Sequence, residues 1–337
     1  MNDSIDIIVT WVDGTDPKWL TEKQDWLKNE NIEHGSNSSI RFESWDNLQY
    51  WFRAVERFMP WFRNIIFVTY GHIPDFLNIH HPRLKVVKHS DYIPVDYLPT
   101  FNSNTIEMNF YRIKQLSENF IIFNDDLFPL QPIEETYYFK NNRVCDEAVE
   151  NIVTTAAYGP VAHIARYASV NNMFIINKYF KKREVQERNW EKWYCEDYGE
   201  RLERTKSLQY WYDFPGFYDP HMANAMKKTV LSHLWDIEKE ILDQASRNRF
   251  RDYSDVTQYL IRYWQLCTGE FYPRKTKGKF YFVTLENCRT IAKSIEMQEY
   301  QMVSLNEDCT PEEFEEIKYH INRAFEKILP DKSSFEK

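Results

Sequence analysis

The sequence predicts an α/β fold with a mainly parallel β-sheet. Short apolar runs of strand length alternate with helical patterns along the first third of the chain, as they do in βαβ units. A second observation is a helical pattern over residues 106–116, which leads directly into the wholly apolar run at residues 120–123. The third observation is composition. Aromatic residues make up 17% of the chain and only 8 residues are glycine, which indicates a large folded core with little flexible linker.

Each predicted element rests on apolar spacing and on local start or stop signals. Asp46 is expected to cap the helix over residues 48–58, which Pro60 ends. Thr310 opens a capping box with Pro311 at the first helical position, so it begins the last helix. The other predicted elements are strands over residues 5–9, 65–69, 84–87, 279–285 and 301–305, a helical stretch from His221 to about Ala245, and a helix from Asp255 to Gly269.

The chain is expected to divide into three parts. Residues 1–133 form an α/β half that would bind the nucleotide part of a substrate. Residues 134–215 are charged and aromatic with looser patterning, which indicates a helical insertion or cap. Residues 216–337 are expected to form the third part, with the histidine and arginine stretches and the C-terminal helix.

Composition and charge exclude several classes of protein. The net charge is -9 and the 42 basic residues are spread along the chain, so no extended basic stripe for nucleic acid is expected. The five cysteines include no Cys-x-x-Cys pair, which favours free thiols in a reducing compartment over a zinc site or a disulfide framework. The N-terminus does not resemble a signal peptide and no apolar run is long enough to span a membrane. The predicted location is cytoplasmic, and a peripheral contact with the membrane stays open.

Polar residues follow the strand at residues 120–123. Asn124, Asp125 and Asp126 would stand at the carboxyl end of that strand, where an α/β sheet opens into its ligand crevice. Two adjacent carboxylates suit Mg²⁺ (or Mn²⁺), which takes oxygen ligands and binds substrate phosphates as well. The alternative is a simple turn, because these residue types also hydrogen-bond their own backbone in loops.

Two other stretches carry candidate site residues. The loop after the first strand holds Trp11, Asp13 and Gly14, which would contact a nucleotide, although this loop is not a glycine-rich phosphate loop. Further along, three arginines alternate in an extended-looking piece that would aim them all to one side, where they suit bidentate phosphate contacts. These are Arg247, Arg249 and Arg251. An ordinary surface charge cluster is the other interpretation.

Several separated motifs resemble, in order, those of the Stealth family of hexose-1-phosphate transferases, which includes bacterial capsule polymerases. The matching stretches are IDIIVTWVDGTDP at residues 5–17, the block over residues 46–126 with LPTFNS and NDD, Pro220-His221-Met222 followed by residues 246–255, SLNED at residues 304–308, and the ending at residues 330–336. The fourth stretch departs from the family pattern, which has Asn-Asp where this chain has Asn306-Glu307. Asp308 is the residue that would substitute there.

The resemblance implies a reaction and a set of roles. The donor would be a nucleotide sugar, commonly a UDP-hexose, and a sugar hydroxyl of a polysaccharide or oligosaccharide acceptor would attack its β-phosphorus. The fold implied is a Rossmann-like (GT-A-like) sheet with a helical insertion or cap. Asp125 and Asp126, with Asn306 and Asp308, are the predicted metal ligands. The predicted catalytic residues are His221 as the base, Arg251, Asp13 and Asp126, and the predicted donor-binding residues are Trp11, Gly14, Asn102, Arg112, Arg247 and Arg249.

The setting implied is bacterial surface polysaccharide synthesis, with an acceptor that a lipid carrier would hold at the inner face of the cytoplasmic membrane. Two other functions remain open at this stage. One is a metal-dependent GT-A-type glycosyltransferase, which would release a nucleoside diphosphate. The other is a non-catalytic glycan-binding module.

Overall fold

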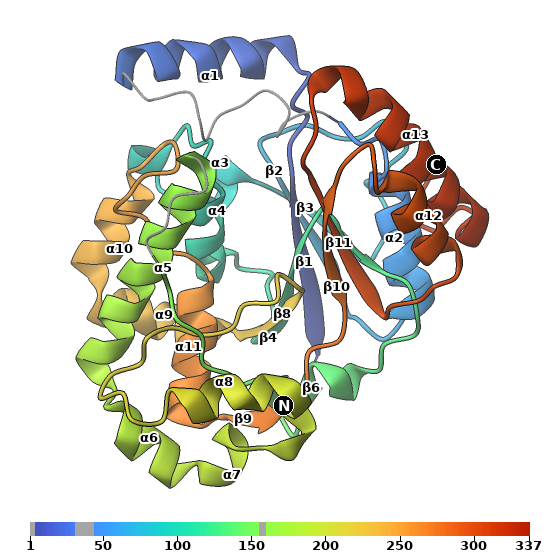
Figure 1. The fold of residues 1–337 in the computed structure, drawn as a ribbon. Coiled ribbons are helices and arrows are strands. Elements are labelled where there is room, and N and C mark those ends of the chain that lie inside the picture. The colour runs from blue at the N-terminus through green and yellow to red at the C-terminus, as the bar shows by residue number, and fades with distance from the viewer. Residues whose placement is uncertain (1–3, 31–43, 155–159) are drawn as a thin grey trace.

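A five-stranded sheet forms the centre of the protein (Figure 1). The computed structural model describes residues 4–30, 44–154 and 160–337. The strand order is β3-β2-β1-β4-β8, and all neighbours are parallel except β4 and β8. The strands are β1 (Ile5–Trp11), β2 (Ile65–Thr69), β3 (Leu84–Lys88), β4 (Asn119–Asn124) and β8 (Asn224–Lys227). The predicted α/β fold with a mainly parallel sheet is therefore confirmed.

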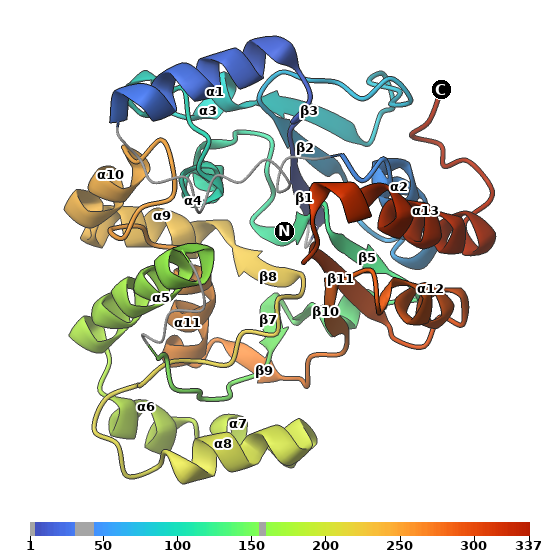
Figure 2. The same ribbon diagram turned by 45° about the horizontal axis from the view of Figure 1, so that its top comes forward.

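The central strands are apolar because both of their faces are covered. Every residue of β2 is buried, and so are the first five residues of β1 and of β4. Helices α2 (Leu48–Phe58), α12 (Cys288–Glu296) and α13 (Pro311–Ile328) lie on one side of the sheet in both ribbon views. The other side carries α4 (Ser103–Met108), α9 (Lys228–Ile237) and α10 (Lys239–Ser246), while α1 (Pro17–Glu30) lies across one end of the sheet (Figures 1 and 2).

Two smaller sheets join distant parts of the chain. The first has the order β10-β11-β5, and it sets β11 antiparallel to the strand that follows β4. The second has the order β6-β7-β9, with β7 and β9 parallel. The strands are β5 (Leu127–Pro129), β6 (Phe139–Lys140), β7 (Arg143–Asp146), β9 (Phe271–Pro273), β10 (Lys279–Val283) and β11 (Met302–Glu307).

The described part of residues 134–215 is mainly helical, with two short strands at its start. Its long helix α5 packs against α11 (Tyr259–Thr268), and its strand β7 pairs with β9 from the last part of the chain. The helices here are α5 (Pro160–Tyr179), α6 (Lys182–Arg188), α7 (Trp190–Trp193) and α8 (Leu202–Ser207), with 3-10 turns at Glu135–Tyr137 and Glu196–Arg201. The three-part division of the chain stays a prediction.

Several predicted boundaries are confirmed. The capping box of Thr310 and Glu313 opens α13 with Pro311 at its start, and Gly269 ends α11 in the left-handed conformation. Helix α2 starts at Leu48 after Asn47, so the prediction that Asp46 is its cap is wrong by one residue. Helix α11 begins four residues later than predicted, because Asp255 is buried and accepts side-chain amide bonds from Asn102 and Asn104 instead.

The helix predicted over residues 106–116 is wrong in its length. Helix α4 ends at Met108, and a 3-10 turn at Phe110–Arg112 follows it. Asn109 stands at the break, where its buried side-chain amide donates to the carbonyl of Thr105 at 2.9 Å and to the hydroxyl of Ser246 at 3.2 Å. Such bonds to nearby groups compete with helix continuation, which explains the interruption.

The helical stretch predicted from His221 is wrong at its start. His221 lies in a turn, and the strand β8 follows before α9 and α10 begin. The β8 residues Asn-Ala-Met-Lys have little preference for a strand, so pairing with β4 decides their conformation. Short helices at His89–Tyr92 (α3) and Val95–Tyr97 complete the fold. Within the described ranges, no helix combines the length and the apolar character that crossing a membrane requires.

Candidate active site

The carboxyl ends of three central strands meet at one edge of the sheet. The parallel register pairs Thr10 of β1 with Asn124 of β4, and Trp11 of β1 with Thr69 of β2. The order β3-β2-β1-β4 changes direction between β1 and β4, and ligands of open α/β sheets bind at such a switch point. Trp11 and Asp125 directly follow the paired residues Thr10 and Asn124, so both lie at the edge where a ligand is expected.

Strand β11 brings the fourth sequence motif to the same place. The backbone N–H of Leu305 donates to the carbonyl of Asp126 at 3.0 Å, and the hydroxyl of Ser304 lies 3.3 Å from the Asp126 carboxylate. Asn306 and Glu307 end this strand. The predicted metal residues Asp125, Asp126 and Asn306 are thus brought together, although they come from opposite ends of the chain.

The acidic side chains at this edge influence one another electrostatically. Desolvation by the surrounding protein, together with the charges of Asp126 and Glu307, raises the pKa of Asp125 to about 7, although the Asp125 side chain itself is exposed. One carboxylate oxygen of Asp126, Oδ1, is buried and makes no hydrogen bond. A cation would relieve both the repulsion and the unsatisfied oxygen.

The donor set here fits Mg²⁺ better than a metal that needs a complete protein cage. Oxygen atoms of Asp125, Asp126 and Asn306 are the type of ligand that Mg²⁺ takes, and Mg²⁺ usually keeps several waters and binds substrate phosphates. Over residues 4–30, 44–154 and 160–337, no three His, Cys, Asp or Glu side chains are grouped closely enough to hold a metal by themselves. Asp308 directly follows β11, its side chain is exposed and its N–H donates to the carbonyl of Val283, and its role as a ligand stays a prediction.

His221 faces the acidic residues from a tight turn. Its Nε2 atom lies 3.5 Å from Oδ2 of Asp126, and its ring packs edge-on against Phe280. The backbone of His221 has a φ of 52°, in the left-handed region that few non-glycine residues adopt and that often marks functional sites. Burial lowers the pKa of His221, but the hydrogen bond and charge of Asp126 and the charge of Glu107 outweigh burial and raise the pKa above its ordinary value.

Glu107 was not among the residues predicted from the sequence, although its charge acts on both His221 and Arg251. Glu107 is 6% exposed on α4, and burial raises its pKa to about 7 against the opposing effects of Arg251, His221 and a hydrogen bond to Gln258. A buried carboxylate among charged partners is typical of functional sites. The sequence signal was a single glutamate inside an apolar helical pattern, between Ile106 and Met108.

Arg251 is the predicted arginine that reaches this group. One of its guanidinium nitrogens donates to the hydroxyl of Ser103 at 2.9 Å, and the charges of Glu107 and Asp255 act on it. Burial lowers the pKa of Arg251 nevertheless. Asp126, His221, Glu107 and Arg251 therefore form one electrostatically connected group, which we call the His221 cluster.

The other two arginines of this segment point elsewhere, so the prediction that all three face one side is wrong. Arg247 pairs with Asp243 one turn earlier at 2.8 Å, because the segment begins as the end of helix α10 and is not extended. Arg249 stacks over the ring of Trp26 at 4.1 Å and donates to the carbonyl of Leu98. Neither contact involves a member of the His221 cluster.

Asn102 and Arg112 lie in supporting positions. Asn102 is fully buried, and its amide donates to the carbonyls of Asn248 and Phe250, so it holds the arginine segment in place. Arg112 donates to Asn109 at 2.9 Å and stacks over Trp235 at 4.8 Å. The donor-binding role of Asn102 and Arg112 stays a prediction.

The first loop is ordered by its own polar contacts. The Asp13 carboxylate accepts hydrogen bonds from the backbone and the hydroxyl of Thr15, and the Asp13 N–H donates to His72 at 3.0 Å. Trp11 stacks against Phe67 with ring centroids 5.9 Å apart. Trp11, Asp13 and Gly14 thus lie at the carboxyl edge of the central sheet, which we call the ligand edge, because β1 ends there beside β4.

Comparison with known proteins identifies relatives along the whole chain. Stealth conserved region 1 matches residues 3–30, and Stealth conserved region 2 matches residues 41–146. A capsular polysaccharide phosphotransferase, WcwK, of Streptococcus pneumoniae is 38% identical over 99% of this chain and 98% of its own. The exopolysaccharide phosphotransferase cps2G of Lactiplantibacillus plantarum is 33% identical over 99% and 96%, and the receptor polysaccharide phosphotransferase WefC of Streptococcus gordonii is 32% identical over all of both chains.

This degree of identity over the full length of each relative exceeds what a shared fold alone produces. The two matched regions also contain the first loop and the Asn124-Asp125-Asp126 motif of the ligand edge. The protein therefore belongs to the Stealth family, and it is an enzyme of the transferase class.

Proposed function

We propose that this enzyme transfers a hexose-1-phosphate unit from a nucleotide sugar, in the first place a UDP-hexose, to a hydroxyl group of a polysaccharide. The product is a phosphodiester, and a nucleoside monophosphate is released. Three relatives are named as phosphotransferases of a capsular polysaccharide, an exopolysaccharide and a receptor polysaccharide, which supports the acceptor class. The observation that carries the proposal is the contact between His221 and Asp126 at the switch point of the sheet.

Asp125 and Asp126, with Asn306, are the residues that would hold Mg²⁺ at this edge. When bound, the ion would neutralise charge on the donor diphosphate, which is a main requirement of phosphoryl transfer. The buried, unpaired Oδ1 of Asp126 and the raised pKa of Asp125 support this role. Trp11, Asp13 and Gly14 would contact the nucleotide from the neighbouring strand end.

His221 is proposed as the general base. Its neutral imidazole takes the proton from the acceptor hydroxyl while that oxygen forms a bond to the β-phosphorus of the donor. The bond between the β-phosphorus and the bridging oxygen breaks, and the electron pair leaves with the nucleoside monophosphate. The Asp126 carboxylate stabilises the imidazolium that results, since an adjacent negative charge favours the protonated ring.

Arg251 is proposed to stabilise the negative charge on the phosphoryl oxygens in the transition state. The hydrogen bond to Ser103 orients its guanidinium, and the charge of Glu107 acts on it, so little reorganisation is needed when the charge develops. Arg247 and Arg249 have their own partners and are left out of this role.

The nucleotide that is released tests the proposal. The enzyme is incubated with Mg²⁺, a panel of UDP-sugars and a polysaccharide fragment, and the products are separated by anion-exchange chromatography and examined by phosphorus NMR. We expect UMP and a new phosphodiester resonance. Release of UDP with a product free of phosphorus would show ordinary glycosyl transfer. Glycan binding without release of any nucleotide would show a binding module.

A further inference from the structure

A fully buried arginine stands behind the turn that carries His221. Arg262 of α11 is 0% exposed and uses all of its donors. Its guanidinium makes two bonds to the Asp146 carboxylate, at 2.8 and 3.0 Å, and one to the carbonyl of Glu147 at 2.9 Å. The remaining nitrogen donates to the carbonyl of Tyr218 at 3.1 Å and to the Asp219 carboxylate at 2.9 Å.

The segment that Arg262 holds is fixed from other directions too. The N–H of Tyr218 donates to the carbonyl of Val149 at 2.8 Å, and the Asp219 carboxylate accepts a bond from the hydroxyl of Tyr263. Arg201 lies over the Tyr218 ring, 4.9 Å from its centroid. The backbone and ring of Tyr218 and the carboxylate of Asp219 are thus each held by a different partner.

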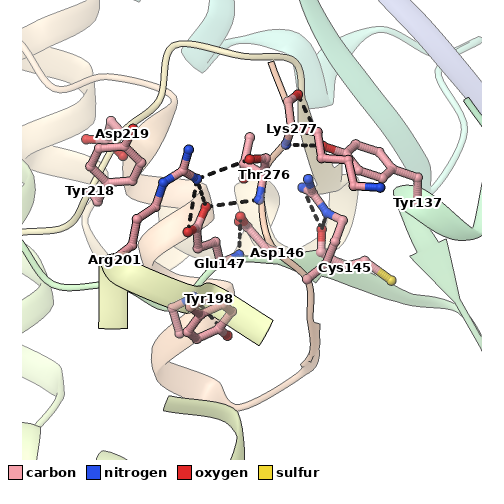
Figure 3. Close-up of polar contacts among 12 residues, drawn as sticks. Tyr137, Cys145, Asp146, Glu147, Tyr198, Arg201, Tyr218, Asp219, Thr276 and Lys277 are labelled. Carbon is pink, nitrogen blue, oxygen red and sulfur yellow. Dashed lines mark hydrogen bonds and ion pairs between the residues drawn. The ribbon is translucent and has the colours of Figure 1, made fainter. Parts of the chain in front are cut away.

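Figure 3 shows how Arg201 itself is anchored. Its guanidinium reaches the Glu147 carboxylate at 2.7 Å and the carbonyl of Thr276 at 3.1 Å, while the N–H of Thr276 donates to the same carboxylate. Glu147 is 0% exposed. Asp146 and Glu147, adjacent at the end of β7, therefore each hold an arginine, and both arginines contact the segment at Tyr218 and Asp219.

Pro220 transmits this fixed position to His221. The proline ring locks its own φ and restricts the conformation of Asp219 before it, so few torsions remain between the Arg262 contacts and the imidazole. The next residue, His221, has a φ of 52° and so needs support from its surroundings. The contacts of Asp219, two residues earlier, supply such support.

We propose that Arg262, acting through Asp219 and the carbonyl of Tyr218, is a positioning residue that holds His221 against Asp126. Arg262 touches no substrate in this proposal, which rests on the proposed role of His221 as the base. A buried guanidinium with bidentate geometry suits the task, because lysine would have the charge without the planar fork that spans Asp146, Tyr218 and Asp219.

The test compares Arg262→Lys and Asp219→Asn with Arg53→Lys in the full-length enzyme. Asp219→Asn keeps the size and one acceptor of the side chain, so it remains informative if Arg262→Lys folds poorly. Arg53 is the matched control, since it is also largely buried and pairs with Glu336 at 2.7 Å, but it joins α2 to the C-terminal segment. Thermal unfolding, kcat and the KM for the donor are measured for each protein.

We expect kcat to fall in both Arg262→Lys and Asp219→Asn, by about 100-fold in Arg262→Lys, because displacement of a catalytic group by about 1 Å has effects of this size. The KM for the donor should change by less than about threefold. In spectra of protein labelled at histidine Cε1, the His221 cross-peak should move in these two variants and stay in place in Arg53→Lys. The cross-peak is assigned by its loss in His221→Ala.

The inference would be overturned if kcat and the His221 cross-peak were unchanged in Arg262→Lys and Asp219→Asn while the melting temperature fell as in Arg53→Lys. Arg262 would then have a structural role alone. Full activity of His221→Ala would instead overturn the assignment of the base. The cross-peak separates these two failures, since it reports the position of the ring whether or not His221 takes the proton.

Discussion

His221 Nε2 lies 3.5 Å from Asp126 Oδ2, although the two residues belong to different sequence motifs. The contact follows from the pairing of β8 with β4. Because these strands are antiparallel, with Ile122 opposite Asn224, the turn before β8 lies beside the end of β4. The candidate base therefore meets the carboxylate of the metal motif through a backbone pairing.

Replacement of His221 by alanine should lower kcat by roughly 10²- to 10⁴-fold, the usual contribution of a positioned general base. The KM for the donor should change little, because the imidazole acts on the acceptor hydroxyl. Steady-state kinetics with the best UDP-sugar measure both constants. His233→Ala is the control, since His233 is exposed on α9 and its ring packs on Trp264. Equal losses in the two variants would contradict a specific role for His221.

Replacement of Asp126 by asparagine should lower the pKa of His221. Asp126 raises this pKa through its hydrogen bond and its charge, and the amide supplies no charge, so the imidazolium loses its stabilisation. An NMR titration of histidine Cε1 in the presence of a chelator measures the pKa without interference from a metal. An unchanged His221 pKa in Asp126→Asn would mean that the two groups do not interact in solution.

Removal of divalent cations should abolish turnover, and Mg²⁺ should restore it. Asp125→Asn should raise the Mg²⁺ concentration for half-maximal rate by roughly tenfold or more, since loss of groups around a metal commonly costs 10- to 100-fold in affinity. Asp236→Asn is the control and should behave as the wild type, because Asp236 is exposed on α9. Full activity in excess chelator would rule out the metal site.

Protein stability should fall as the pH rises from about 5 to 8, in part because of Glu107. Burial raises the pKa of Glu107 in the folded state to about 7, above the ordinary value of 4.5. The folded protein therefore binds this proton more tightly than the unfolded chain, and its stabilising effect is present at low pH and is lost as the pH rises through 7.

Glu107→Gln, which stays neutral, should remove this part of the pH dependence and unfold at higher denaturant concentration than the wild type at pH 8. The difference in the free energy of unfolding should be on the order of 3 kcal/mol, since each unit of pKa corresponds to about 1.4 kcal/mol. Urea titrations at pH 5 and pH 8 measure it. Glu191→Gln, at an exposed position of α7, is the control and should leave the pH dependence intact. A parallel pH dependence in Glu107→Gln and the wild type would contradict the raised pKa.

The local sequence pattern was sufficient to predict an element where residues close in the chain decide its structure. The apolar runs predicted β1, β2 and β4 because both faces of a central parallel strand are buried, and they predicted the edge strand β3, in which Leu84 and Val87 are buried. The Thr310 capping box predicted the start of α13 for the same local reason. The polar residues after β1 and β4 could be placed together from sequence, since parallel strands share one carboxyl edge.

Residues that depend on distant partners could not be placed in this way. The strand β8 has no apolar pattern of its own and exists because β4 offers it an edge, so the helix predicted there was wrong. Arg247, Arg249 and Arg251 look equivalent in sequence, but Arg247 pairs with Asp243, Arg249 stacks over Trp26, and the charge of the buried Glu107 acts on Arg251. Glu107 drew no attention because its burial and its charged neighbours are properties of the folded protein.

The sequence by itself determined the α/β class, the positions of the first four strands along the chain and the polar motifs at the ends of β1 and β4. The tertiary structure decided that His221 meets Asp126, that the charge of Glu107 acts on Arg251, and that Arg262 joins Asp219, two residues before His221, to Asp146 of β7. The physical reason is that apolar periodicity is set within a few residues, whereas a charge becomes functional through partners and burial that only long-range chain pairing supplies.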